Sequence, residues 1–208
     1  MICPECKSHL KILRGNLCYK CGKMLIDENA EYCEDCSKMK HVYTEGRSLY
    51  EYRAVDASIY RFKYGGRCEY ADYYAKAFAY YLGDVINGWN PDAIIPVPLH
   101  KKKMRKRGYN QSALIAKGIS KELGIPYLED VIIRSRNTVA MKELDARTRQ
   151  INLKNAFKIC HFDVKLKHIV IVDDIYTTGS TIDSMASVLF EHGVQKVFFV
   201  TLATGAAI

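Results

Sequence analysis

Two adjacent carboxylates, Asp173 and Asp174, precede a short run of hydroxyl-bearing residues around one glycine. Backbone N–H groups at the start of a helix bind phosphate well, and Ser and Thr hydroxyls add donors. Ordinary helix capping is the alternative explanation for such a run. Two acids and a cap alone would favour capping, but the full run is more specific and also fits a site for a phosphorylated ligand, with five candidate binding residues: Thr177, Thr178, Gly179, Ser180 and Thr181.

The N-terminal region contains three C-x-x-C pairs, each separated from the next by eleven residues. Zn²⁺ takes four thiolates in a tetrahedron, so two pairs make one site. We favour Cys18, Cys21, Cys33 and Cys36 as the ligands of a structural zinc ion. Cys3 and Cys6 are additional candidates: they are spare, serve a partner, or exchange with another pair. The isolated Cys68 and Cys160 are expected to be packed thiols.

A basic run occupies residues 100–107, with six Lys or Arg in eight positions. It follows an apolar stretch, residues 92–99, in which Pro96 and Pro98 prevent a continuous central strand and favour a rigid turn. Such a run is a solvated loop, a nucleic-acid patch or a cradle for a polyanion. Because it lies beyond a strand end, the polyanion is favoured.

The elements that must position these groups alternate between strand and helix. Apolar runs at residues 92–99, 131–133, 169–172 and 196–202 predict strands, and helical spacing predicts helices over 55–63, 69–86, 113–123 and 182–190. This alternation predicts an α/β fold with a parallel sheet flanked by helices over residues 41–208. Residues 1–40 have few large apolar side chains, so we expect a small zinc-ribbon-like module that needs its metal to fold.

Three other stretches of the chain leave alternatives open. Tyr60 and Tyr64 alternate with Arg61 and Lys63, as in aromatic surfaces that stack on single-stranded nucleic acid, although an amphipathic helix is the favoured interpretation. Residues 134–155 are a solvated loop or a loop that closes over the site. Residues 152–157 are expected to return to the sheet.

The motifs together resemble a known family. The run V-D-D-I-Y-T-T-G-S-T is similar to the phosphoribosyl-pyrophosphate (PRPP) signature of type I phosphoribosyltransferases. With P-V-P-L, the basic run, R-G-Y-N-Q-S and R-x-x-N-L-K-N-A-F, the chain resembles the ComF family of competence-associated phosphoribosyltransferase-like proteins. That family also carries an N-terminal zinc module, often with four cysteine pairs. It usually has Gln where Met141 stands.

This resemblance implies a PRPP site. The 5′-phosphate is expected at residues 177–181, and the ribose hydroxyls at Asp173 and Asp174, with Mg²⁺ bridging hydroxyls and pyrophosphate. Lys102 and Lys103 would stabilise the departing pyrophosphate, and Pro98, His100 and Arg107 would contact PRPP. Purine-salvage members place a base-contacting Asp where this chain has Thr177, so a purine acceptor is not expected.

The implied roles are DNA uptake in natural competence or nucleotide salvage, with pyrophosphate release from PRPP. A non-catalytic adaptor that binds PRPP or single-stranded DNA is the alternative. The basic excess of the main region, 24 Lys and Arg against 17 Asp and Glu in residues 41–208, suits an anionic partner. We expect other DNA-uptake proteins as partners, a cytoplasmic location with reduced cysteines, and no membrane insertion.

Overall fold

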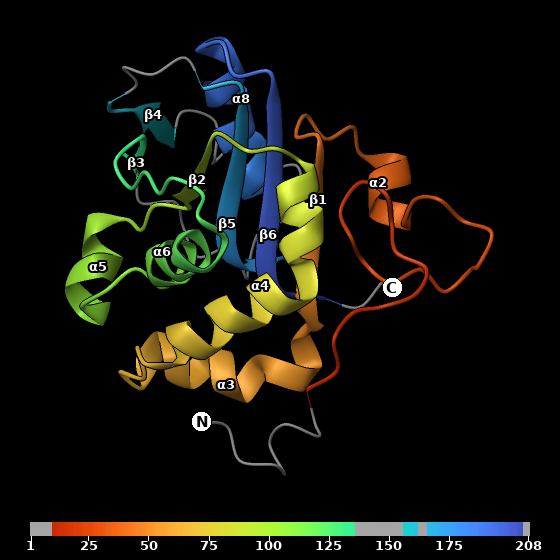
Figure 1. The fold of residues 1–208 in the computed structure, drawn as a ribbon, viewed down its shortest axis with the longest axis horizontal. Helices are drawn as coiled ribbons and strands as arrows, with labels where there is room; N and C mark the ends of the chain where they lie inside the picture. The colour runs from red at the N-terminus through yellow and green to blue at the C-terminus, as the bar shows by residue number, and fades with distance from the viewer. Residues whose placement is uncertain (1–9, 136–155, 162–165, 206–208) are drawn as a thin grey trace.

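The protein is described here as a computed structural model covering residues 10–135, 156–161 and 166–205. Its centre is a parallel sheet of four strands, in the order β1-β6-β5-β2. The strands are β1 (Glu45–Glu51), β2 (Ala93–Pro96), β5 (His168–Tyr176) and β6 (Lys196–Thr204). This confirms the predicted parallel sheet and places the two strands with the longest apolar runs, β5 and β6, in its interior (Figure 1).

Helices cover both faces of the sheet. Successive residues of β5 point to opposite sides, and because they are apolar on both sides, both faces must be buried. Val170 and Val172 pack with α3 (Tyr52–Tyr64), α4 (Tyr70–Gly88) and α6 (Gln111–Leu123). Ile169 and Ile171 pack with α8 (Ser180–Glu191), which lies behind the sheet in Figure 1. Each of the four helices agrees with a predicted helical segment to within a few residues.

One expectation about local structure was wrong. β4 (Phe157–Ile159) does not join the main sheet, but pairs antiparallel with β3 (Ile132–Arg134) in a separate two-stranded sheet. The basic run, for which a solvated loop was one of three alternatives, forms a short helix, α5 (Lys101–Arg107). His100 starts this helix, because its Nδ1 accepts a hydrogen bond from the backbone N–H of Lys102 at 3.2 Å. Gly108, with φ 84°, ends it in the left-handed conformation.

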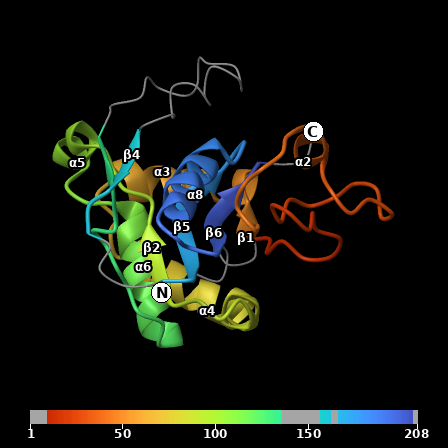
Figure 2. The same cartoon turned by 90° about the horizontal axis from the view of Figure 1, so that it is seen from above.

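The cysteine-rich segment lies along the free edge of β1. Leu13 donates its N–H to the carbonyl of Leu49 at 3.0 Å, and Gly46 donates to the carbonyl of Lys20 at 2.9 Å. This segment includes the short helix α2 (Glu34–Lys38). Figure 2 shows it on the side of the molecule opposite α5 and β4. Because it covers an edge strand, it shields backbone groups that would otherwise be open to other chains.

In the described ranges, every helix is too short or too polar to cross a membrane. The loop predicted over residues 134–155 falls, from residue 136 on, outside the described residues, as do Met141, Cys3 and Cys6.

Candidate phosphate, carboxylate and metal sites

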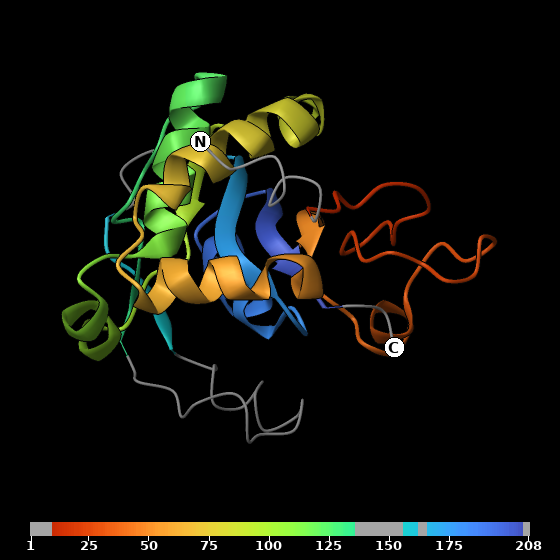
Figure 3. The ribbon, with the colours of Figure 1, turned by 90° about the horizontal axis from the view of Figure 1, so that it is seen from below.

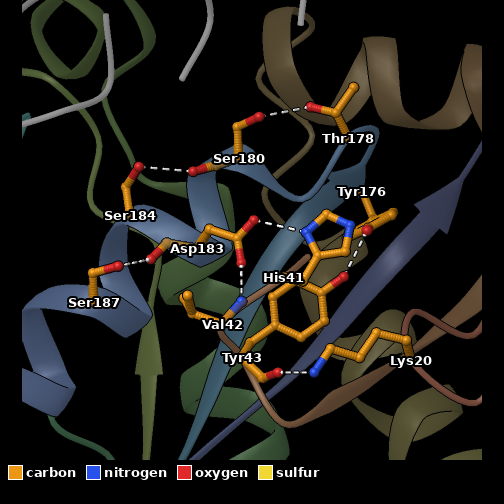
Figure 4. Close-up of polar contacts among 10 residues, drawn as sticks. All are labelled: Lys20, His41, Val42, Tyr43, Tyr176, Thr178, Ser180, Asp183, Ser184 and Ser187. Carbon is orange, nitrogen blue, oxygen red and sulfur yellow. Dashed lines mark hydrogen bonds and ion pairs between the residues drawn. The ribbon is translucent and has the colours of Figure 1, made fainter. Parts of the chain in front are cut away.

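Residues 177–181 follow Tyr176, the last residue of β5, and comprise the turn 177–179 and the first two residues of α8, Ser180 and Thr181. Gly179 is the N-cap of α8 and has φ 75° and ψ −8°. A glycine cap has no side chain to accept hydrogen bonds from the first turn, so the N–H groups at this helix end are left for another acceptor. The hydroxyls of Thr178 and Ser180 contact each other at 2.9 Å (Figure 4). We call this segment the β5–α8 loop.

No side chain fits at Gly179. A Cβ atom there would lie 2.8 Å from the hydroxyl of Tyr176 and 3.0 Å from Cε1 of His41. The positive φ would strain any other residue as well. Glycine is therefore required both by the conformation of the loop and by the close packing behind it.

Asp173 and Asp174 lie at the end of β5 and are both partly buried. Oδ1 of Asp173 accepts hydrogen bonds from the Ser112 hydroxyl at 3.0 Å and from the backbone N–H of Asp174 at 2.8 Å. Oδ2 of Asp174 forms an ion pair with Nζ of Lys63 at 2.8 Å. Burial, together with the neighbouring charge of Asp174, raises the pKa of Asp173 to about 7.

A basic pocket of about 470 Å³ opens beside these carboxylates, between the C-terminal end of α3 and α5. It is lined by two tyrosines, one glycine and four cationic residues: Tyr60, Lys63, Tyr64, Gly66, Lys103, Lys106 and Arg107. Figure 3 shows α3 crossing beneath the sheet from the β1 side to the α5 side. Lys63 therefore joins the two sites, because it lines the pocket and pairs with Asp174.

The charges in this pocket act on one another. The guanidinium of Arg107 lies 5.0 Å from the centre of the Tyr64 ring and donates a hydrogen bond to Gln111. Burial, followed by the positive charges of Arg134 and Arg107, lowers the pKa of Lys103 below its usual value. An anion bound here would relieve this repulsion, so the pocket suits a polyphosphate group.

The predicted residues of the basic run are distributed unevenly. Lys103 and Arg107 line the pocket, whereas Lys102 is not one of its lining residues. His100 is the cap of α5, and desolvation and the cations around it lower its pKa. Pro98 lies in the turn after β2, which the Val97 N–H anchors to the Val172 carbonyl at 2.9 Å, one residue before Asp173.

Sequence reasoning missed several residues of this region. Lys106 was counted in the basic run but was not among the residues expected to contact PRPP, although it lies three residues after Lys103 and shares its face of a helix. Lys63 was considered only as part of an aromatic and basic stretch, and nothing in its spacing connects it to Asp174. Ser112 was likewise not expected to contact Asp173.

The four favoured cysteines converge. The sulfur atoms of Cys18, Cys21, Cys33 and Cys36 all lie within 4.8 Å of one another, and three of these residues are buried. Hydrogen bonds from the Cys21, Cys33 and Cys36 thiols lower the pKa of Cys18, which favours a thiolate. Four sulfur donors at this separation suit tetrahedral Zn²⁺.

A buried cation accompanies this cluster. Nζ of Lys23 lies 2.6 Å from Asp35 Oδ2. Burial opposes the charged form, but the hydrogen bond and charge of Asp35, with the nearby Cys21 and Cys33, raise the pKa of Lys23 overall. The Lys23 ammonium group would partly offset the negative charge of a zinc tetrathiolate.

Cys68 and Cys160, in contrast, are exposed thiols, so the expectation that they are packed was wrong. Cys68 lies in the connection between α3 and α4, and Cys160 directly follows the three-residue strand β4.

A parallel sheet whose strand ends in two acids, followed by a glycine-capped helix, defines a domain of the phosphoribosyltransferase type. Residues 109–207 match the family described as phosphoribosyl transferase domain. The chain is 31% identical over 203 residues to DNA utilization protein YhgH of Salmonella typhimurium, covering 94% of this chain and 87% of that protein. It is 28% identical over 213 residues to competence protein F of Haemophilus influenzae, covering 94% and 93%.

The chain therefore belongs to the ComF family, which includes competence protein F and DNA utilization protein YhgH. Among solved structures it is similar to a hypoxanthine phosphoribosyltransferase from Staphylococcus aureus, with a TM-score of 0.40 and 13% identity over 66% of this chain and 64% of that one.

Proposed function

We propose that this protein binds PRPP at the C-terminal end of β5 and transfers its ribosyl phosphate to an acceptor, releasing pyrophosphate. One observation carries the proposal: the Asp173–Asp174 pair lies between a glycine-capped helix start and a pocket lined by four cations. PRPP has the same order of groups, a phosphate, a diol and a pyrophosphate.

Each part of the site would then have one task. The β5–α8 loop binds the 5′-phosphate through its backbone N–H groups and hydroxyls. Asp173 and Asp174 accept hydrogen bonds from the ribose hydroxyls, each with the oxygen that Ser112 or Lys63 does not occupy. Lys103 and Arg107, with Lys63 and Lys106, hold the pyrophosphate. We assign Lys102 no direct contact.

Carboxylate oxygens beside a polyphosphate pocket are a donor set that suits Mg²⁺. Asp173 and Asp174 would help to hold a Mg²⁺ ion, which would supply positive charge to offset that of the pyrophosphate. The residues of this chain contribute positioning and electrostatic stabilisation: the cations offset charge on the leaving group, and the two carboxylates stabilise the positive charge that develops on the ribose. Thr177 is exposed and lacks a carboxylate, so we do not propose a purine base as acceptor.

The test is calorimetry with PRPP and Mg²⁺ on the wild type and on the double variant Asp173→Asn, Asp174→Asn. Each substitution removes a charge-assisted hydrogen bond, so we expect PRPP affinity to fall by at least ~2 kcal/mol, roughly thirtyfold. Asp84→Asn, at an exposed position of α4, removes the same charge and should bind PRPP as the wild type does. Equal affinities in all three proteins would refute a PRPP site here.

Turnover needs a second measurement. Incubation with PRPP, Mg²⁺ and a pool of nucleobases or a cell extract should release pyrophosphate in the wild type and not in the double variant. PRPP binding without pyrophosphate release would favour a non-catalytic adaptor.

The adaptor is our second candidate, because two tyrosines of the pocket are exposed. Tyr60 and Tyr64 are 65% and 59% exposed, and their ring centres are 5.2 Å apart. Aromatic rings among cations stack on the bases of single strands. The names of the relatives, competence protein F and DNA utilization protein YhgH, support a role for this chain in DNA uptake alongside other uptake proteins.

This candidate predicts that Tyr60→Leu with Tyr64→Leu weakens binding of an oligothymidylate, by about 1–3 kcal/mol for each base that stacks. Pyrophosphate binding should not change, since the cations remain. Tyr80→Leu, at an exposed tyrosine of α4, is the control. Unaltered oligothymidylate binding in the double variant would exclude this pocket as a DNA site. We propose the cytoplasm as the location, because the six described cysteines form no disulfide and four of them suit a metal ion.

A further inference from the structure

His41 connects the segment that follows the cysteine cluster with the first turn of α8. Its side chain is 1% exposed, and its Nδ1 lies 2.7 Å from Oδ2 of Asp183. The backbone N–H of the next residue, Val42, donates to Oδ1 of the same carboxylate at 2.9 Å. Figure 4 shows both contacts reaching Asp183 from one side. Both oxygens of Asp183 are therefore held by two consecutive residues that precede β1.

The position of Asp183 explains why this matters. Asp183 lies in the first turn of α8, and its N–H donates to the carbonyl of Gly179 at 2.8 Å. A carboxylate this close to the β5–α8 loop would repel a phosphate if its side chain turned toward the loop. The two hydrogen bonds from residues 41 and 42 hold it toward His41 and occupy both of its oxygens.

The ring of His41 also packs against the β5–α8 loop at Gly179. It approaches the position that a Cβ of Gly179 would occupy to 3.0 Å, and it stacks on Tyr43 with ring centres 4.9 Å apart. The hydroxyl of Tyr43 contacts that of Tyr176, the last residue of β5, at 2.8 Å. Lys20, which lies between Cys18 and Cys21, donates a hydrogen bond to the Tyr43 carbonyl. The loop is thus packed against residues that the cysteine segment holds in place.

The second ring nitrogen of His41 does not contribute to stability. Nε2 of His41 is buried and, among the described residues, has no hydrogen-bond partner. A buried polar atom without a partner costs stability, so an apolar ring would be better for folding alone. The histidine therefore contributes something that an apolar ring of similar size could not, and its contact with Asp183 is the contribution visible in the structure.

We propose that His41 is a positioning residue of the β5–α8 loop. By fixing Asp183 and the backbone at Gly179, it holds the N–H groups of the loop in the geometry that a sugar 5-phosphate needs. This inference rests on the proposed function, because it assigns that ligand group to the loop. It also gives the cysteine segment a role in ligand binding beyond its own folding.

The test uses two probes that separate the loop from the basic pocket, ribose 5-phosphate and inorganic pyrophosphate with Mg²⁺. His41→Phe keeps a ring behind Gly179 but cannot hydrogen-bond to Asp183. We expect it to bind ribose 5-phosphate about tenfold more weakly, since a charge-assisted hydrogen bond is lost, with pyrophosphate affinity unchanged. His41→Asn can place an amide N–H near the position of Nδ1 and should recover most of the affinity.

Ile26→Ala is the control, because Ile26 is an exposed residue of the same cysteine-rich segment that takes no part in the contacts to Asp183 or Gly179. It should bind both probes as the wild type does. Zinc content and melting temperature are measured for every variant, and the melting temperature also shows whether His41→Phe is folded. If His41→Phe does not fold, the comparison of His41→Asn with His41→Ala decides, with the alanine variant expected to lose ribose 5-phosphate binding.

The outcomes separate the two proposals. Ribose 5-phosphate binding that is equal in wild type, His41→Phe and His41→Ala overturns the role of His41 while leaving the PRPP site intact. An equal loss of both probes also overturns it, since the defect would then be general. A wild type that binds neither ribose 5-phosphate nor PRPP overturns the proposed function itself.

Discussion

At the scale of single residues, the partly buried carboxyl group of Asp173 makes ligand binding depend on pH. Its raised pKa of about 7 means that the folded protein keeps a proton that an exposed Asp loses near pH 4. The ionised carboxylate accepts a hydrogen bond from a ribose hydroxyl more strongly than the protonated acid does. PRPP affinity should therefore rise about tenfold between pH 6 and pH 8, and calorimetry at both values measures it. Asp173→Asn should remove most of this dependence.

The same pKa shift affects stability, with the opposite sign to a salt-bridged Asp. Because the folded state binds the proton more tightly than the unfolded state, the contribution of Asp173 to stability falls as the pH rises from about 4 to about 7. Asp173→Asn should accordingly raise the melting temperature of the ligand-free protein at pH 8 while it weakens PRPP binding. A lower melting temperature at pH 8 would show that the ionised group is better compensated than its burial suggests.

Gly179 gives a second prediction for a single residue. In Gly179→Ala the new methyl group would meet Tyr176 and His41 at 3.0 Å or less, and the backbone would keep its positive φ. We expect a loss of about 1–3 kcal/mol in the free energy of unfolding. We also expect ribose 5-phosphate to bind more weakly than it does to the control variant below. Denaturant unfolding and calorimetry check the two parts. Gly193→Ala also changes a glycine of positive φ, but with open space around it, and is the control for strain alone.

At the scale of elements, α5 has two cationic faces that differ in what they contact. Lys103, Lys106 and Arg107 line the pocket, as helical spacing allows, whereas Lys102 and Arg105 do not. Lys103→Ala with Lys106→Ala should weaken pyrophosphate and PRPP binding by at least tenfold, and Lys102→Ala with Arg105→Ala should change it by less than about twofold. The two double variants lose equal charge. Equal losses of affinity would mean that net charge, not the pocket, attracts the ligand.

At the scale of the whole molecule, we propose residues 1–40 and 41–208 as two domains whose stability is shared, because the first covers the β1 edge of the second. Metal analysis should find about one zinc per chain, lost in Cys18→Ser and in Cys36→Ser. Cys3→Ser, outside the described residues, should retain it. Chelation should lower the melting temperature of the whole chain in a single transition. Two separate transitions, with the second unaffected by chelation, would contradict this coupling.

The sequence alone determined the parts of this protein that depend on neighbouring residues. The strand, the two acids and the Gly179 turn are consecutive, so the β5–α8 loop could be predicted from residue types and spacing. The zinc ligands could also be predicted, because two C-x-x-C pairs supply the four thiolates that the metal requires. The alternation of strand and helix similarly predicted a parallel sheet.

Only the tertiary structure decided which distant residues complete these sites. Lys63 meets Asp174, and His41 meets Asp183 across 142 positions, because α3 crosses beneath the sheet and the cysteine segment packs at its β1 edge. The pairing of β4 with β3 and the two faces of α5 were decided in the same way. Such contacts depend on how elements pack, and the packing energy is spread over many apolar side chains that carry no signal for a particular polar pair.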